Sequence, residues 1–143
     1  ITMKNIIFVC TGNTCRSPMA EALFKANLTQ DEKLNIEVKS YGLAVFGSDT
    51  ANENAVKVMR ERNIDISAHR STPLSRLAVE NADLIVTMTK SHTDALLSAG
   101  VPNEKLMTLN VPDPFGGSIE DYRRCADEIA AKLESVYDYI RKN

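Results

Sequence analysis

The sequence predicts a single α/β domain over residues 1–143, with a three-layer α/β/α architecture around a central parallel sheet of about four strands. The length of 143 residues is that of one ordinary domain. Hydrophobic residues make up 43 % and charged residues 25 %, as in an average soluble globular protein. Short apolar, β-rich runs alternate with stretches in which apolar residues recur every three or four positions. This alternation is typical of parallel strands joined by right-handed helical crossovers.

The composition excludes several classes of protein. The 17 basic and 19 acidic residues give a net charge of −2, so we expect no nucleic-acid partner and no membrane partner. No apolar run approaches the roughly 18 residues of a membrane span, and the run at 6–9 is too short for a secretion signal. Three cysteines, an odd number, argue against a disulfide-stapled secreted domain and predict a cytoplasmic protein with reduced thiols. Ile1 and Thr2 precede Met3, where we expect the natural chain to start.

The first half of the chain alternates between strand and helix signals. Lys4–Cys10 is a continuous apolar run, short enough for a buried strand. Gly12 and Asn13 mark a turn after it, and Pro18 suits the first turn of the next helix. By the same criteria we expect a helix from Ser17 to Leu28, a strand from Ile36 to Ser40, a loop from Gly42 to Ser48, a helix ending near Arg62 and a helical stretch from Pro73 to Leu77.

The second half continues the alternation. Ser118 and Asp121 form a capping-box pattern at the start of one long final helix, whose apolar stripe runs from Ile119 to Ile140. Ligands of parallel sheets bind where loops leave the carboxyl ends of strands, so the loops at 10–17 and 111–117 should meet there. The other elements expected are a strand from Ala82 to Met88, a helix around His92–Leu97 and a strand from Leu106 to Leu109.

The segment from Cys10 to Pro18 carries the chemistry. It joins a strand to a helix N-terminus, where backbone N–H groups converge and the helix dipole adds positive potential. Gly12 and Asn13 tolerate the positive φ needed to curl the loop around an anion. The planar guanidinium of Arg16 can hold two oxygens of a tetrahedral anion. Cys10 would lie at the floor of this site, where the same field favours its thiolate, a nucleophile for in-line attack on phosphorus.

Other interpretations of this segment fit its spacing less well. Cys10 and Cys15 are not a C-x-x-C pair and no second pair exists, so we expect no metal. One glycine and no lysine match neither nucleotide-binding fingerprint, and we expect no cofactor. A core cysteine at 10 and a solvated arginine at 16 are the structural alternatives. The expected phosphate-binding loop comprises Thr11, Gly12, Asn13, Thr14, Cys15 and Ser17 around the two catalytic residues.

The leaving group also needs a proton. Asp113 is the best candidate for the general acid, because Pro114 biases it away from a helix and into a defined loop. A plain turn aspartate is the alternative, and His69 and His92 are alternative acids. His92 falls in a helical pattern and is expected at the surface, whereas His69 is expected to be buried and hydrogen-bonded. Cys125, beside the apolar stripe of the final helix, is expected to be inert.

Two motifs, VCTGNTCRSPMAE and DPFGG, resemble the signatures of the low-molecular-weight protein tyrosine phosphatase family. They lie about one hundred residues apart, as in that family, and the resemblance covers essentially the whole chain. It implies the fold of that family, with Cys10 as nucleophile, Arg16 as phosphate clamp and Asp113 as general acid and then base. It also implies a hydrogen-bond network that holds the loop, formed by Asn13, Ser17, Ser40 and His69. The family's Ser-Ala-Gly after the second strand is Ser-Tyr-Gly at 40–42 here.

Thr14 and Phe115 are expected to select the substrate. Tyrosine-specific members usually carry a branched apolar residue four positions after the nucleophile, and a threonine there resembles the bacterial protein-arginine-phosphatase branch. The Thr14 hydroxyl can pair with a guanidinium N–H. Phe115 can stack on a phenyl ring or on a guanidinium. We therefore favour phosphoarginine in proteins as the substrate, with phosphotyrosine as the alternative.

Two interpretations come from other classes of protein. An arsenate reductase shares the fold and the loop but relays a disulfide through further cysteines, and residues 72–92 contain none. A non-catalytic anion-binding module would lack the nucleophile or the acid. Cys15 is a candidate to form a disulfide with an oxidised Cys10. The partners we expect are a phosphorylated protein substrate and, as an inhibitor in the loop, inorganic phosphate or another oxyanion; we expect the chain to act as a monomer.

Overall fold

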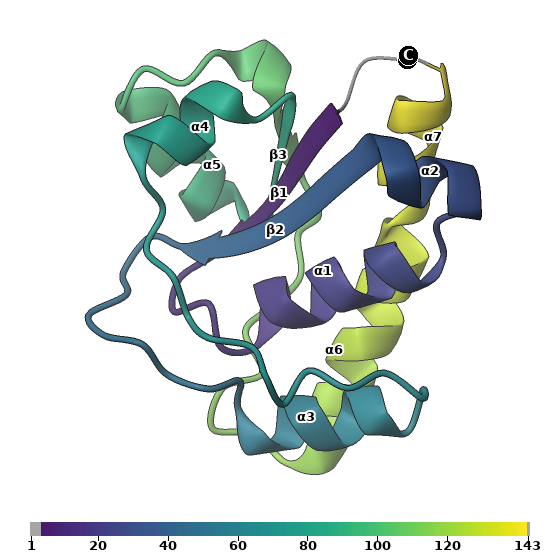
Figure 1. The fold of residues 1–143 in the computed structure, drawn as a ribbon. Helices are drawn as coiled ribbons and strands as arrows, with labels where there is room; N and C mark the ends of the chain where they lie inside the picture. Colours follow the sequence, from purple (N-terminus) through teal and green to yellow (C-terminus); the bar gives the residue numbers. More distant parts are fainter. Residues whose placement is uncertain (1–3, 143) are drawn as a thin grey trace.

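A parallel sheet with the strand order β2-β1-β3-β4 forms the centre of the molecule (Figure 1). The computed structural model describes residues 4–142, so the expected start at Met3 lies outside the described residues. The strands are β1 (Lys4–Cys10), β2 (Ile36–Gly42), β3 (Leu84–Thr87) and β4 (Leu106–Thr108). The helices are α1 (Arg16–Ala26), α2 (Gln30–Asn35), α3 (Glu53–Arg60), α4 (Arg76–Asn81), α5 (Lys90–Ser98), α6 (Ile119–Lys132) and α7 (Glu134–Lys142), with a 3-10 turn at Asn103–Lys105.

Successive side chains of β1 point into two different cores. Ile6 and Phe8 belong to the larger core, which is completed by residues of α1, α3, α6 and α7. Ile7 and Val9 belong to the smaller core on the other face, where α5 packs. Figure 1 shows α4 and α5 on the opposite side of the sheet from α1 and α6. The predicted three-layer α/β/α fold is therefore confirmed.

All strands end at the same edge because every pair is parallel. The loop that follows β1 and the loop that follows β4 both leave from this edge, and the helix after each loop begins there. The capping box predicted at Ser118 and Asp121 is confirmed at the start of α6.

Helices α2 and α4 and strand β2 differ from the sequence-based expectation. Helix α2 was not expected; Thr29 and Glu32 form a capping box that nucleates it. Helix α4 begins at Arg76 rather than Pro73, because the Ser75 side chain caps it and Pro73 pairs with the end of β2 instead. Strand β2 runs two residues past Ser40 because its last residues pair with β1.

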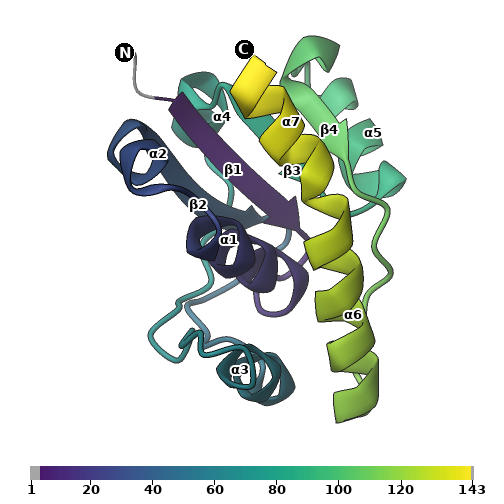
Figure 2. The same cartoon turned by 90° about the vertical axis from the view of Figure 1, so that its right-hand side faces the viewer.

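The final helix is two helices rather than one. It breaks at Leu133, where the carbonyl accepts from the N–H groups of both Val136 and Tyr137. The tighter turn changes the helix direction, as Figure 2 shows for α6 and α7. Ile129 and Ile140, on either side of the break, remain buried in the same core. The apolar stripe predicted a continuous helix because it continues unbroken across the bend. Within residues 4–142, no helix is long and apolar enough to cross a membrane.

An ion pair ties α7 to α2. Arg141 donates to both carboxylate oxygens of Glu32, at 2.9 and 3.1 Å. This hydrogen bonding lowers the pKa of Glu32 from its ordinary value of 4.5 to about 2. A depressed carboxyl pKa stabilises the fold above the unfolded value, and the contribution is lost as the pH falls toward the folded value.

We therefore expect Glu32→Gln to lower the free energy of unfolding by about 1 kcal/mol at neutral pH, since solvent screens the pair. The difference from the unmodified chain should shrink as the pH falls from 4.5 to about 2. Urea unfolding at a series of pH values measures it. The matched control is Glu53→Gln, which removes an exposed pair with Lys57 and should change stability by less than about 0.5 kcal/mol. A pH-independent loss for Glu32→Gln would contradict the assignment.

Candidate active site

A hollow of about 240 Å³ opens at the carboxyl edge of the sheet. It lies between the loop after β1 and the loop that precedes α6. A ladder of backbone hydrogen bonds holds the two loops together: Met88 N–H donates to the Val9 carbonyl, and Val111 N–H donates to the Met88 carbonyl, at 3.1 and 2.7 Å. The hollow is lined by Cys10, Thr11, Gly12, Thr14, Cys15, Arg16, Asp113 and Phe115.

The first loop is curled and clamped by its neighbours. Asn13 has a φ of 57°, in the left-handed region that asparagine tolerates better than most residues. The carbonyls of Cys10 and Thr11 each accept an N–H from the segment after β2, at 2.9 Å. A Cβ on Gly42 would lie 2.6 Å from the Thr11 carbonyl oxygen, so only glycine permits this close approach.

The side-chain amide of Asn13 directs a hydrogen-bond network behind the loop. Its Oδ1 accepts the backbone N–H of Thr72 at 2.9 Å, which fixes the orientation of the amide. Its Nδ2 therefore donates to Oγ of Ser17 and of Ser40, at 2.7 and 3.1 Å. Ser40 in turn donates to the carboxylate of Glu21 at 2.6 Å, because a carboxylate can only accept.

The direction of these hydrogen bonds determines which groups can donate to the sulfur of Cys10. The Ser17 oxygen already accepts from Asn13, so its own proton is free to point to Cys10 Sγ, 2.9 Å away. The other acceptor within reach, the Tyr41 carbonyl, lies at 3.5 Å. The backbone N–H of Asn13 donates to the same sulfur at 3.3 Å. Two donors are therefore directed at one buried sulfur.

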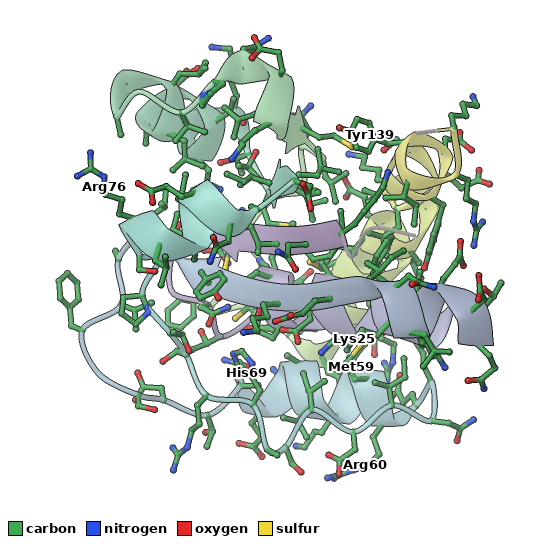
Figure 3. All side chains as sticks on the ribbon, turned by 45° about the horizontal axis from the view of Figure 1, so that its top comes forward. Lys25, Met59, Arg60, His69, Arg76 and Tyr139 are labelled. Carbon is green, nitrogen blue, oxygen red and sulfur yellow. The ribbon has the colours of Figure 1, made fainter. Side chains whose placement is uncertain are left out.

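His69 contacts the backbone of the same loop. It lies on the segment between α3 and α4 (Figure 3). Its Nε2 is 2.8 Å from the Asn13 carbonyl oxygen, so it donates to that oxygen. The ring is half-buried. The structure thus brings Asn13, Ser17, Ser40 and His69 into one connected network.

Arg16 and Asp113 meet across the hollow. Arg16 is buried, and its Nη1 donates to the Val111 carbonyl at 3.0 Å. Its Nη2 lies 3.6 Å from Asp113 Oδ2. The Asp113 side chain is about half exposed, and its other oxygen accepts the Phe115 N–H at 3.0 Å. The arginine is therefore fixed by the protein, while the carboxyl group remains accessible to a bound molecule.

The other two cysteines are also buried: Cys15 belongs to the loop itself, and Cys125 lies on α6. Burial raises the pKa of Cys15, whose sulfur lies 3.4 Å from the hydroxyl of Tyr122. Burial also raises the pKa of Cys125 to about 12. Both remain neutral thiols at neutral pH. Within residues 4–142, no group of three or more His, Cys, Asp or Glu side chains is arranged to hold a metal ion.

One expectation about the histidines is wrong. His92 was expected at the surface, but it is buried, and its Nε2 lies 2.9 Å from Oγ1 of Thr11. Its spacing of four residues from the buried Leu96 is the signal that would have placed it on the inner face of α5. The sequence also gave no indication of the supporting roles of Glu21, Thr72 and Tyr122.

The arrangement can bind a tetrahedral dianion and attack it. Loop N–H groups, the N-terminus of α1 and Arg16 supply positive potential at one point. Cys10 lies at that point with two donors on its sulfur, and Asp113 faces the opening. These are the parts needed for nucleophilic displacement with proton transfer to a leaving group.

Comparison with known proteins agrees with this chemistry. The family model of low molecular weight phosphotyrosine protein phosphatases matches residues 5–143. A protein-arginine-phosphatase from Bacillus subtilis is 40 % identical over 149 residues, covering 97 % of this chain and 98 % of that protein. An arsenate reductase from Bacillus cereus is 38 % identical over 131 residues, covering 92 % of both chains. The structure of a YwlE arginine phosphatase mutant with a phosphorylated active-site serine superposes with a TM-score of 0.87, at 39 % identity and 97 % coverage of both chains.

Substitutions at Asn13 should separate the effect of its left-handed backbone on stability from the effect of its side-chain amide on phosphate binding. Asn13→Ala removes the amide and imposes left-handed strain of about 1–2 kcal/mol, whereas Asn13→Gly removes only the amide. We expect both variants to bind inorganic phosphate about tenfold more weakly, by calorimetry, because the loop loses its hydrogen bonds. The melting temperature should fall further for Asn13→Ala than for Asn13→Gly. Phosphate affinity equal to that of the unmodified chain in both variants would show that the network does not shape the site.

Proposed function

The chain belongs to the low molecular weight phosphotyrosine protein phosphatase family, and on that premise we propose that it is a protein-arginine phosphatase that works through a cysteinyl-phosphate. The observation that carries the proposal is the convergence of Cys10, Arg16 and Asp113 on one hollow. Similarity to the Bacillus subtilis protein-arginine-phosphatase over nearly the full length of both chains supports it.

In the first step the Cys10 thiolate attacks phosphorus and forms an S–P bond. Arg16 and the loop N–H groups hold the phosphoryl oxygens as charge develops on them. The P–N bond of phosphoarginine breaks, and Asp113 gives its proton to the departing guanidine nitrogen. The accessible position of Asp113 at the opening suits it to meet this nitrogen.

In the second step the roles of the acid and base reverse. The Asp113 carboxylate takes a proton from a water molecule, whose oxygen attacks the cysteinyl-phosphate. The S–P bond breaks, inorganic phosphate is released and the Cys10 thiolate is restored. Ser17 stabilises the thiolate as leaving group through the hydrogen bond that the Asn13 amide directs.

The preference for phosphoarginine is proposed from the rim of the hollow. Thr14 and Phe115 both line it, and the exposed Phe115 ring is free to stack on a planar leaving group. The Thr14 hydroxyl can accept a guanidinium N–H, which an apolar residue of the same shape cannot. Phosphotyrosine is the alternative substrate, in line with the name of the family.

Arsenate reduction is less well supported. The relative from Bacillus cereus shares 38 % identity, but a disulfide relay needs a second reactive cysteine. In the present chain residues 72–92 contain no cysteine. Cys15 and Cys125 are buried thiols with raised pKa values, so both are slow nucleophiles.

Cys15 and the assembly state complete the proposal. We propose that Cys15, a buried residue of the loop, captures Cys10 as a disulfide only after peroxide has oxidised Cys10 to an electrophilic sulfenic acid, with which even a slow thiol can react. We also propose that the enzyme acts in the cytoplasm, where its thiols stay reduced. We propose further that it acts as a monomer, since Cys10, Arg16 and Asp113 come together within a single chain.

Substitution of the nucleophile and of the acid tests the mechanism. Cys10→Ser should abolish hydrolysis of a phosphoarginine peptide and still bind inorganic phosphate. Asp113→Asn should lower kcat by about 10²–10⁴-fold, because the leaving nitrogen and the water lose their proton partner. Phosphate release, measured with each variant, checks both expectations. Turnover by Cys10→Ser at the rate of the unmodified chain would refute the assignment of the nucleophile.

Substitution of Thr14 tests the specificity. Thr14→Val keeps the shape and removes the hydroxyl, and Thr14→Ile also enlarges the apolar surface. We expect both to lower kcat/KM on a phosphoarginine peptide relative to a matched phosphotyrosine peptide by about tenfold, or about 1.4 kcal/mol. Equal changes on both substrates would mean that Thr14 tunes the loop as a whole, and the phosphotyrosine alternative would then be favoured.

A further inference from the structure

A buried histidine contacts a residue that lines the hollow, and the mechanism above does not use this histidine. Nε2 of His92 lies 2.9 Å from Oγ1 of Thr11. Thr11 follows the nucleophile directly and lines the hollow together with Thr14 and Phe115. The contact joins α5 to the phosphate-binding loop across 81 positions of the sequence.

Both nitrogens of the His92 ring are engaged. Nδ1 lies 3.0 Å from Oγ1 of Thr89, the residue that caps α5. Burial, and next the positive charge of Arg16, lower the pKa of His92. The ring is therefore neutral at neutral pH, with one N–H and one lone pair. It donates to one threonine and accepts from the other.

Either tautomer leaves a lone pair on the Thr11 oxygen. If Nε2 donates, the hydroxyl keeps its proton and its second lone pair; if Nε2 accepts, the hydroxyl keeps both lone pairs. In both cases the contact with His92 fixes the position of this oxygen at the rim. A guanidinium offers N–H donors to such an oxygen, whereas the phenyl ring of phosphotyrosine offers none.

We propose that His92 is a positioning residue for substrate selection, which holds the Thr11 hydroxyl as an acceptor for the guanidinium N–H groups of phosphoarginine. The inference rests on the proposed phosphoarginine activity. It gives Thr11 a role in specificity beside Thr14. It also explains why a polar ring, rather than an aliphatic side chain, is buried at the start of α5.

A double-mutant cycle on the full chain tests the proposal. The variants are His92→Leu, Thr11→Val and their combination, with kcat/KM measured on matched phosphoarginine and phosphotyrosine peptides. Each single variant should lower the ratio of kcat/KM on phosphoarginine to kcat/KM on phosphotyrosine about tenfold. The combination should lower it no further, because His92 acts through Thr11.

Two more variants sharpen the cycle. His92→Gln, whose amide can reach the Thr11 hydroxyl, should recover most of the ratio. Asp94→Asn is the matched control: it removes an exposed ion pair with Lys90 on α5 that involves neither His92 nor Thr89, and the ratio should stay unchanged.

Inhibition by inorganic phosphate separates this role from a purely structural one. A structural role for His92 would weaken phosphate binding and lower both activities in proportion, which overturns the proposal. Additive losses in the combined variant also overturn it. If His92→Leu does not fold, an unchanged ratio in Thr11→Val is decisive against it. If the unmodified chain has no phosphoarginine activity, the proposed function itself is overturned. If it has that activity but His92→Leu leaves the ratio unchanged, only this inference is overturned.

Discussion

The side-chain amide of Asn13 is the interaction on which the site depends. Because its oxygen accepts from the Thr72 backbone, its two N–H bonds can only point to Ser17 and Ser40. This orientation directs the Ser17 proton toward Cys10. The left-handed backbone at the same residue, with a φ of 57°, turns the loop around the hollow. One residue thus sets the shape of the proposed anion site and directs a hydrogen-bond donor toward the proposed nucleophile.

The site divides into a rigid floor and an accessible rim. The floor consists of the loop N–H groups, Cys10 and the buried Arg16, and in the proposed mechanism it binds the phosphoryl group in the same way whatever the leaving group. The rim, where Asp113 and Phe115 are exposed, would meet the part of the substrate that leaves in the proposed reaction. A common floor cannot discriminate among substrates, so selectivity has to come from the rim. Relatives named for arginine phosphatase and arsenate reductase activity are consistent with one scaffold serving several chemistries.

Residue patterns that are local in the sequence made the fold and the central residues of the site predictable. The remaining features depend on tertiary contacts between residues far apart in the sequence. Strand β1, the loop after it and the cap at Ser118 each depend on residues close together in sequence. The spacing from Leu96 could have placed His92 on the inner face of α5, but its contact with Thr11 could not be inferred, because that loop lies 81 positions away in the sequence. Glu21 gains its role only when α1 packs beside β2 and meets Ser40. The bend at Leu133 leaves the apolar stripe unbroken, so the pattern alone could not reveal it.

The most direct test of the account is to locate the phosphoryl group during turnover. The chain is mixed with a phosphoarginine peptide, quenched within the first turnover and mapped by mass spectrometry. The account predicts a burst of free arginine-containing peptide equal to the enzyme concentration, with the phosphoryl group on Cys10. A burst with the phosphoryl group on another residue would contradict the account. Steady release of peptide with no phosphorylated enzyme, under conditions in which a cysteinyl-phosphate survives, would contradict it as well.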